Sequence, residues 1–210
     1  MLLNKINIPL SKGLEMKNYR EDILNNFIER YEKSSYYKGK SLKPQKSSIV
    51  LHERYPQYGQ SRYPEVLEKI EDVVLQLEKE DLIQFAKGSI EGNRKLIFVP
   101  TEERVSKIYQ ELDRTPLKEK RNRYLNCLKM YELDSFFKDF QIAMEEKVFN
   151  YESVLPYLKV YDQEDLKNVM KILQGMKNQE EEISFRKFSE KVLGDTKKLE
   201  KYKNKIYHII

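Results

Sequence analysis

Apolar residues recur at helical spacing over most of the chain. In residues 19–33 five of them fall on one face at the spacing of a core-facing helix, namely Ile23, Leu24, Phe27, Ile28 and Tyr31. A second amphipathic helix is predicted over residues 64–82, with Ser61 as its N-cap and Pro64 in its first turn. Both patterns predict helices that each bury one side in a common core.

The stretch between these two helices and the stretch after the second favour extended structure. Helix breakers leave room only for one short strand at residues 48–52. Two β-prone runs, near residues 82–87 and 95–99, flank a loop that contains Gly88, Gly92 and Asn93, which predicts a β-hairpin. Thr101 then provides the N-cap of a further helix.

The resulting order of helix, strand, helix, hairpin and helix resembles a winged helix, in which the hairpin forms the wing. That fold normally has a middle helix, and only the loop at residues 55–60 offers a place for it. The recognition element of such a unit therefore stays undefined by the sequence.

From Thr115 onward the pattern is helical throughout, and no strand is predicted. Gly194 suits the end of one late helix, and Asp195 or Thr196 suits the N-cap of the next. We therefore expect a mainly α protein with a small β-hairpin. It would comprise an N-terminal extension (1–18), a winged-helix-like unit (19–113) and an all-helical arm unit (114–210).

Composition predicts a folded cytoplasmic protein. Charged residues make up 35% of the chain, but 15 Tyr and 9 Phe supply the burial that disordered segments lack. No apolar run approaches the roughly 20 residues that span a bilayer, and the first residues do not read as a signal peptide. The single cysteine, Cys127, has no partner for an intramolecular disulfide, as is usual in a reducing compartment.

Positive charge is unevenly distributed within a formal net charge of +5. Seven Lys and Arg residues lie between Lys33 and Arg62 against one acid, with tyrosines interleaved, and residues 114–129 hold six against one. Taken singly, such runs are usually solvated surface; together with a basic hairpin tip they predict contacts to duplex DNA. The predicted DNA-binding residues are Lys38, Lys40, Lys43, Lys46, Arg54, Arg62, Lys87, Arg94, Lys95, Lys118, Lys120, Arg121 and Arg123.

Residues typical of catalysis are not arranged in recognisable patterns. The two histidines, His52 and His208, have no Cys or His neighbours at zinc-binding spacing. The sequence contains no G-x-S-x-G, Walker-type or G-x-G-x-x-G motif, and no D-x-D pair for a divalent metal. We therefore expect no catalytic residue, no metal ligand and no cofactor in this chain.

Two stretches resemble JetD, the nuclease subunit of the Wadjet anti-plasmid defence system: "ILNNFIERYEKSSYYKGK" (23–40) and "EISFRKFSEKVLGDTKKLEK" (182–201). The resemblance implies the N-terminal DNA-binding and partner-docking region of a longer bacterial nuclease. In that family a metal-dependent Toprim endonuclease domain follows, and condensin-like (SMC-type) JetABC partners present plasmid DNA for cleavage. The resemblance transfers no catalytic residue to this chain, and it assigns no role to residues 194–200.

Two other functions remain open at this point. A stand-alone winged-helix transcription regulator would bind one DNA sequence as a stable dimer. A protein-interaction adaptor would have no affinity for DNA. Oligomeric state, including a homodimer, is not determined by the sequence.

Overall fold

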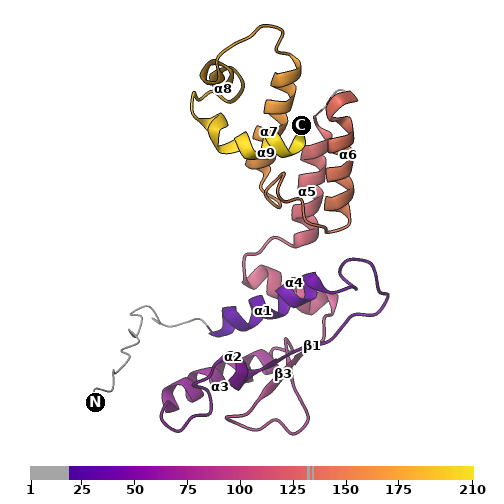
Figure 1. The fold of residues 1–210 in the computed structure, drawn as a ribbon. Helices are drawn as coiled ribbons and strands as arrows, with labels where there is room; N and C mark the ends of the chain where they lie inside the picture. Colours follow the sequence, from indigo (N-terminus) through magenta and orange to yellow (C-terminus); the bar gives the residue numbers. More distant parts are fainter. Residues whose placement is uncertain (1–18, 132, 134) are drawn as a thin grey trace, which may run out of the picture. The chain divides into compact units, whose positions relative to one another are not determined.

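The structure is a computed structural model that describes residues 19–131, 133 and 135–210, so the predicted extension at 1–18 lies outside the described residues. The chain divides into two compact units between Arg114 and Thr115 (Figure 1). The Arg114 guanidinium donates hydrogen bonds to Asn25 and Glu32 of the first unit. Each unit has its own hydrophobic core.

The first unit is mainly helical and contains a small antiparallel sheet. Its elements are α1 (Tyr19–Lys33), β1 (Ser47–Val50), α2 (Leu51–Arg54), α3 (Pro64–Lys79), β2 (Gln84–Phe85), β3 (Lys95–Phe98) and α4 (Glu102–Glu111). The strands are ordered β1-β3-β2, with Ser47 opposite Phe98 in one pair and Phe85 opposite Leu96 in the other. Helix α1 packs against α3, α4 and β1, so it lies at the centre of the unit.

The predicted apolar face of α1 forms the core of this unit. Ile23, Leu24, Phe27 and Ile28 are fully buried, and the Phe27 ring lies 5.3 Å from that of Phe98. The cap at Thr101 is also confirmed, since its side chain accepts a hydrogen bond from the amide of Arg104 at 3.3 Å. These features depend on local periodicity and short-range hydrogen bonds, which the sequence contains.

Two local predictions in this unit were wrong. The N-cap of α3 is Tyr63, not Ser61, with Pro64 in the first turn as expected. The strand predicted at 48–52 ends at Val50, because Leu51 turns into the short helix α2 and is fully buried there. Immediately after α2, Tyr55 and Tyr58 are buried as well, so apolar anchoring holds a segment rich in helix breakers against the core.

The second unit is entirely helical over its described residues. It comprises α5 (Leu117–Lys129), α6 (Ser135–Phe149), α7 (Gln163–Lys177), α8 (Phe185–Leu193), the 3-10 helix η1 (Lys198–Tyr202) and α9 (Lys203–Ile209). Helix α7 supplies the middle of the core with five fully buried residues, Leu166, Val169, Met170, Ile172 and Leu173. Side chains of Asp162 and Ser184 cap α7 and α8.

Residues 194–200 form a corner between α8 and η1. Gly194 ends α8 in the left-handed conformation (φ +69°), as its position predicted. The Asp195 carboxylate accepts hydrogen bonds from the amides of Lys197 and Lys198 at 2.7 and 3.1 Å. Buried Ser189 donates to the carbonyl of Asp195 and accepts from the amide of Leu199 at 3.0 Å. The corner is therefore held by internal hydrogen bonds. The N-cap expected at Asp195 or Thr196 was wrong, because η1 begins after Lys197, while the Asp195 carboxylate binds the amides that precede and open this helix.

A close backbone contact makes Gly59 a sensitive position. Its φ is +79°, and a Cβ added there would lie 2.2 Å from the carbonyl oxygen of Gly92 at the hairpin tip. We expect Gly59→Ala to destabilise the protein by at least about 2 kcal/mol in urea denaturation, because backbone must move in addition to the left-handed strain. Gly88→Ala is the control, since its φ is +80° but nothing lies within 4 Å of the added atom. Equal losses for the two variants would contradict the contact.

Candidate nucleic-acid interface

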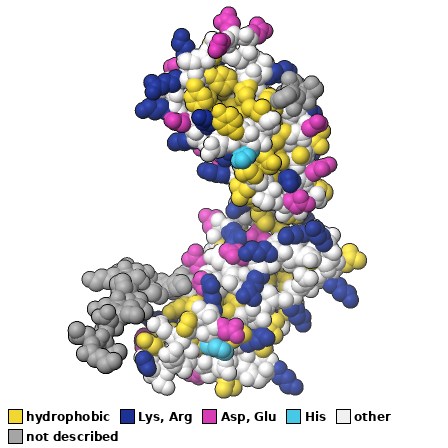
Figure 2. Space-filling model, viewed as in Figure 1, with side chains coloured by type: hydrophobic (Ala, Val, Ile, Leu, Met, Phe, Trp, Pro, Cys, Tyr) yellow, Lys and Arg dark blue, Asp and Glu magenta, His cyan; other side chains and the backbone are white. Residues whose placement is uncertain are grey.

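The strongest concentration of positive charge lies in the segment that joins α1 to β1. Residues 33–46, which start at the last residue of α1 and are here called the basic loop, contain five lysines and no acid. Lys40, Lys43 and Lys46 are exposed, and no ion pair of theirs is found within the described residues. Lys33 lies 3.9 Å from Glu29 in an exposed pair, which neutralises it only weakly. Figure 2 shows Lys and Arg side chains around the part of the first unit where this loop runs.

Aromatic packing and short hydrogen bonds order the root of the basic loop. The Tyr37 ring meets that of Tyr31 edge-on at 5.1 Å, and burial raises the pKa of Tyr31. Ser34 donates to the carbonyl of Tyr31 at 2.6 Å and accepts from the amide of Tyr37 at 3.2 Å. Lys40, Lys43 and Lys46 thus follow a fixed base and are exposed to solvent.

Three DNA contacts were predicted at the hairpin tip, and the structure buries one of them and exposes the other two. Arg94 points inward: its Nε lies 2.5 Å from Glu71, its guanidinium lies 4.3 Å from the centre of the Phe85 ring, and its side chain is only 15% exposed. Lys87 and Lys95 are exposed on the same hairpin. Arg94 is therefore a structural residue, and only the two lysines remain available for a polyanion.

Glu71 of α3 holds three parts of the unit together. Its carboxylate, whose side chain is 8% exposed, accepts hydrogen bonds from Arg94, from the Tyr58 hydroxyl and from the amide of Gly92 at 3.3 Å. Burial, followed by the hydrogen bond to Glu71, raises the pKa of Tyr58. The carboxylate thus ties α3 to the turn after α2 and to the hairpin.

Two further predicted contacts in this region are both exposed, but only one of them has an acidic partner. Arg54 makes a two-pronged ion pair with Asp22, at 3.0 and 2.7 Å, and the Tyr55 hydroxyl donates to the same carboxylate. Burial and this hydrogen bond raise the pKa of Tyr55. For Arg62, in contrast, no ion pair is found among the described residues. The first unit therefore keeps Lys38, Lys40, Lys43, Lys46, Arg62, Lys87 and Lys95 as candidate contacts.

The outer face of α3 is acidic. Its exposed charged side chains include four acids, Glu65, Glu68, Asp72 and Glu78, against two lysines, Lys69 and Lys79. A helix with this surface would meet the phosphates of a duplex with like charge. Helix α3 is consequently a poor candidate for insertion into a DNA groove.

The predicted cluster in α5 is largely engaged within the second unit. Arg123 pairs with Glu119 one turn away, and Lys118 also has an interaction within the chain. Arg121 donates to the carbonyl of Phe149 at 3.2 Å, and its guanidinium lies 4.5 Å from the centre of the Tyr151 ring. Lys120 is the exposed member for which the described residues show no side-chain partner.

A second basic surface in this unit was missed by the sequence prediction. Residues 186–205 hold eight Lys and Arg against three acids, a count that the sequence alone could have supplied. Arg186, Lys187, Lys197 and Lys201 are exposed, whereas Lys205 pairs with buried Asp165 and Lys198 lies 3.4 Å from Glu164. Figure 2 shows Lys and Arg side chains along the edge of the second unit where Figure 1 draws α8.

The described residues contain neither a metal-binding cluster nor a membrane-spanning helix. Within the described residues, no group of three or more His, Cys, Asp or Glu side chains could hold a metal ion. Over the same residues, no helix combines the length and apolar character needed to cross a membrane. No protein-family model, curated protein or solved structure matches the chain.

Arg94 and Lys95 are adjacent on the hairpin, but only Arg94 has a structural role. Arg94→Gln leaves the carboxylate of Glu71 buried without its charged partner, so we expect the unit to lose about 3–5 kcal/mol in the free energy of unfolding. Lys95→Gln, on the exposed side of β3, should change it by less than about 0.5 kcal/mol. Urea denaturation of the full chain measures both. Similar values for the two variants would contradict an internal role for Arg94.

Proposed function

We propose that this chain is the N-terminal DNA-binding and partner-docking region of a JetD-like nuclease subunit, and that the basic loop contacts the phosphates of duplex DNA. The observation that supports it is the run of five lysines without an acid, three of them exposed and outside any ion pair found in the described residues. Together such lysines release counterions from a duplex, a gain that does not depend on base sequence.

We further propose that the first unit is winged-helix-like. The element order and the antiparallel sheet order β1-β3-β2 support this, with β2 and β3 as the wing and α3 in the position of the recognition helix. The acidic outer face of α3 favours contacts from the loop and the wing, through Lys87 and Lys95, over base reading by a helix. It also counts against a sequence-specific transcription regulator.

The proposed setting follows from the resemblance of residues 23–40 and 182–201 to JetD. In that setting the chain acts in the bacterial cytoplasm with condensin-like JetABC partners, and a Toprim domain elsewhere in the parent protein supplies the divalent metal and the cleavage chemistry. The residues of this chain would bind and position the DNA for that domain. The surface on α8 and η1 would add a second set of phosphate contacts.

A protein-interaction role without DNA is the second candidate. The observation that favours it is charge balance, since residues 19–114 hold seventeen Lys and Arg and seventeen Asp and Glu. An evenly charged unit has no long-range attraction for a polyanion. Under this reading the acidic face of α3 would be the contact surface.

Salt-dependent binding to unrelated duplexes separates these candidates. We expect Lys43→Glu/Lys46→Glu to weaken binding at least about tenfold at low salt and to reduce the slope of log K against log salt by about 2, because two phosphate contacts are lost. Fluorescence anisotropy with two duplexes of unrelated sequence measures both quantities. Neither lysine side chain has a partner in the described residues, so folding should be unaffected.

The matched control is Lys167→Glu/Lys171→Glu, which makes the same change in net charge on exposed positions of α7. It should change affinity much less than the loop variant. Equal effects of the two variants would show that only net charge matters. No binding to either duplex would remove the DNA proposal and favour the adaptor, and strong preference for one duplex would favour the regulator.

A further inference from the structure

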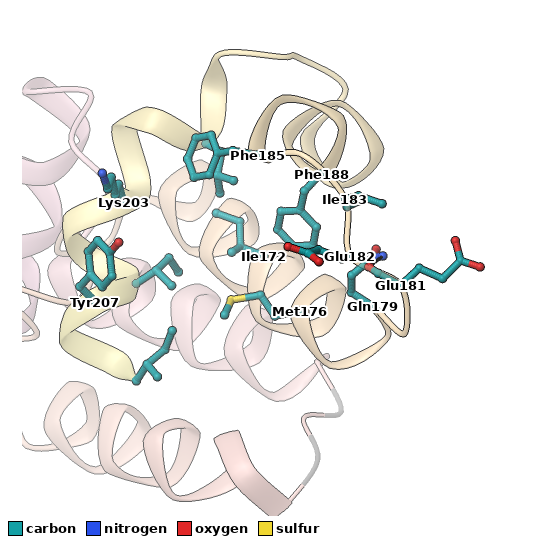
Figure 3. Close-up of a pocket in the computed structure, with 13 residues that line it drawn as sticks. Ile172, Met176, Gln179, Glu181, Glu182, Ile183, Phe185, Phe188, Lys203 and Tyr207 are labelled. Carbon is teal, nitrogen blue, oxygen red and sulfur yellow. Dashed lines mark hydrogen bonds between the residues drawn. The ribbon is translucent and has the colours of Figure 1, made fainter.

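The second unit contains an open apolar groove between α7, α8 and α9 (Figure 3). Its volume is about 530 Å³, within the range of about 300–1,000 Å³ that is usual for ligand sites. Its walls include Ile172 and Met176 from α7, Phe185 and Phe188 from α8, and Ile206 and Tyr207 from α9. The Ser189 and Asp195 hydrogen bonds fix the corner between α8 and η1 and so help to set the position of the α8 wall.

The groove exposes large aromatic side chains. Phe185 is 47% exposed and Tyr207 is 68% exposed, while Phe188 and Ile206 lie deeper. Aromatic rings with this much exposure around a concave apolar surface are typical of a contact site. Isolated exposed apolar residues need no such explanation, but these line one cavity.

The charges around the groove are arranged asymmetrically. Glu181 and Glu182 lie at the end formed by the α7–α8 connection, and Lys203 lies beside Tyr207 at the other (Figure 3). Both carboxylates are exposed, and neither has an ion pair within the described residues. A positive group that enters this end would therefore be attracted to it, and a phosphate would be repelled.

We propose that the groove binds a segment of a partner protein that carries apolar side chains along one helical face and a lysine or arginine that pairs with Glu182. An amphipathic helix in an apolar groove is a common mode of peptide recognition, in which side chains at i, i+3, i+4 and i+7 anchor the helix. The two carboxylates disfavour nucleic acid as the occupant. The residues involved are separate from the basic loop, so this proposal and the DNA proposal stand or fall independently.

The experiment uses the full chain and synthetic amphipathic 14-residue peptides. Four labelled peptides place one lysine at successive positions of a helical turn, and each has a counterpart with glutamate at the same position. We expect at least one lysine peptide to bind about fivefold more tightly than its glutamate counterpart, the value of a partly exposed ion pair. Glu182→Lys should abolish or reverse that preference.

Two variants serve as controls. Glu146→Lys makes the same change in net charge at an exposed position of α6 and should leave the preference intact. Phe185→Ser removes an exposed aromatic ring of the groove and should weaken both peptides of a pair while the fold persists. Circular dichroism checks the fold of each variant.

Four outcomes would overturn the proposal. They are no measurable binding of any peptide, equal binding of lysine and glutamate peptides, binding that Phe185→Ser leaves unchanged, and a stable dimer of the native chain that Phe185→Ser dissociates. The last would show that a second copy of the chain covers the groove. Sedimentation equilibrium of native and Phe185→Ser protein tests that case directly.

Discussion

The carboxylate of Glu71 is the constraint on which the first unit depends. It is almost fully buried on α3, and it is hydrogen-bonded by Arg94 from the hairpin, by Tyr58 from the turn after α2 and by the amide of Gly92. A buried carboxylate is costly unless several donors surround it, so these elements must meet at one place. The close approach of Gly59 to Gly92 lies in the same region and leaves no room for a side chain.

This arrangement decides which cations are available for binding. Arg94 and Arg54 satisfy buried or partly buried acids, and Arg123 pairs with its neighbour Glu119, so part of the positive charge stabilises the fold. Of the predicted contacts of the first unit, Lys40, Lys43 and Lys46 remain exposed in the basic loop, a stretch that has no acid of its own. The proposal of phosphate contacts therefore rests on lysines that internal structure does not use.

The second unit combines two surfaces of different character. Exposed cations of α8 and η1 form one, and the apolar groove with Glu181 and Glu182 forms the other. The corner at residues 194–200 supports both, because its hydrogen bonds fix the end of α8 and the start of η1. A stretch that the resemblance singled out thus has a structural role that its sequence explains.

The sequence by itself determined the helical periodicity, the hairpin, the cap at Thr101 and the helix stop at Gly194, because each depends on residues within a few positions of one another. It could also have revealed the basic stretch at 186–205. Only the tertiary structure decided that Arg94 is internal and that exposed Arg54 pairs with Asp22, since their acids lie 23 and 32 residues away along the chain. The short helix α2 and the apolar groove were likewise beyond local patterns, because both arise where segments distant in sequence pack together.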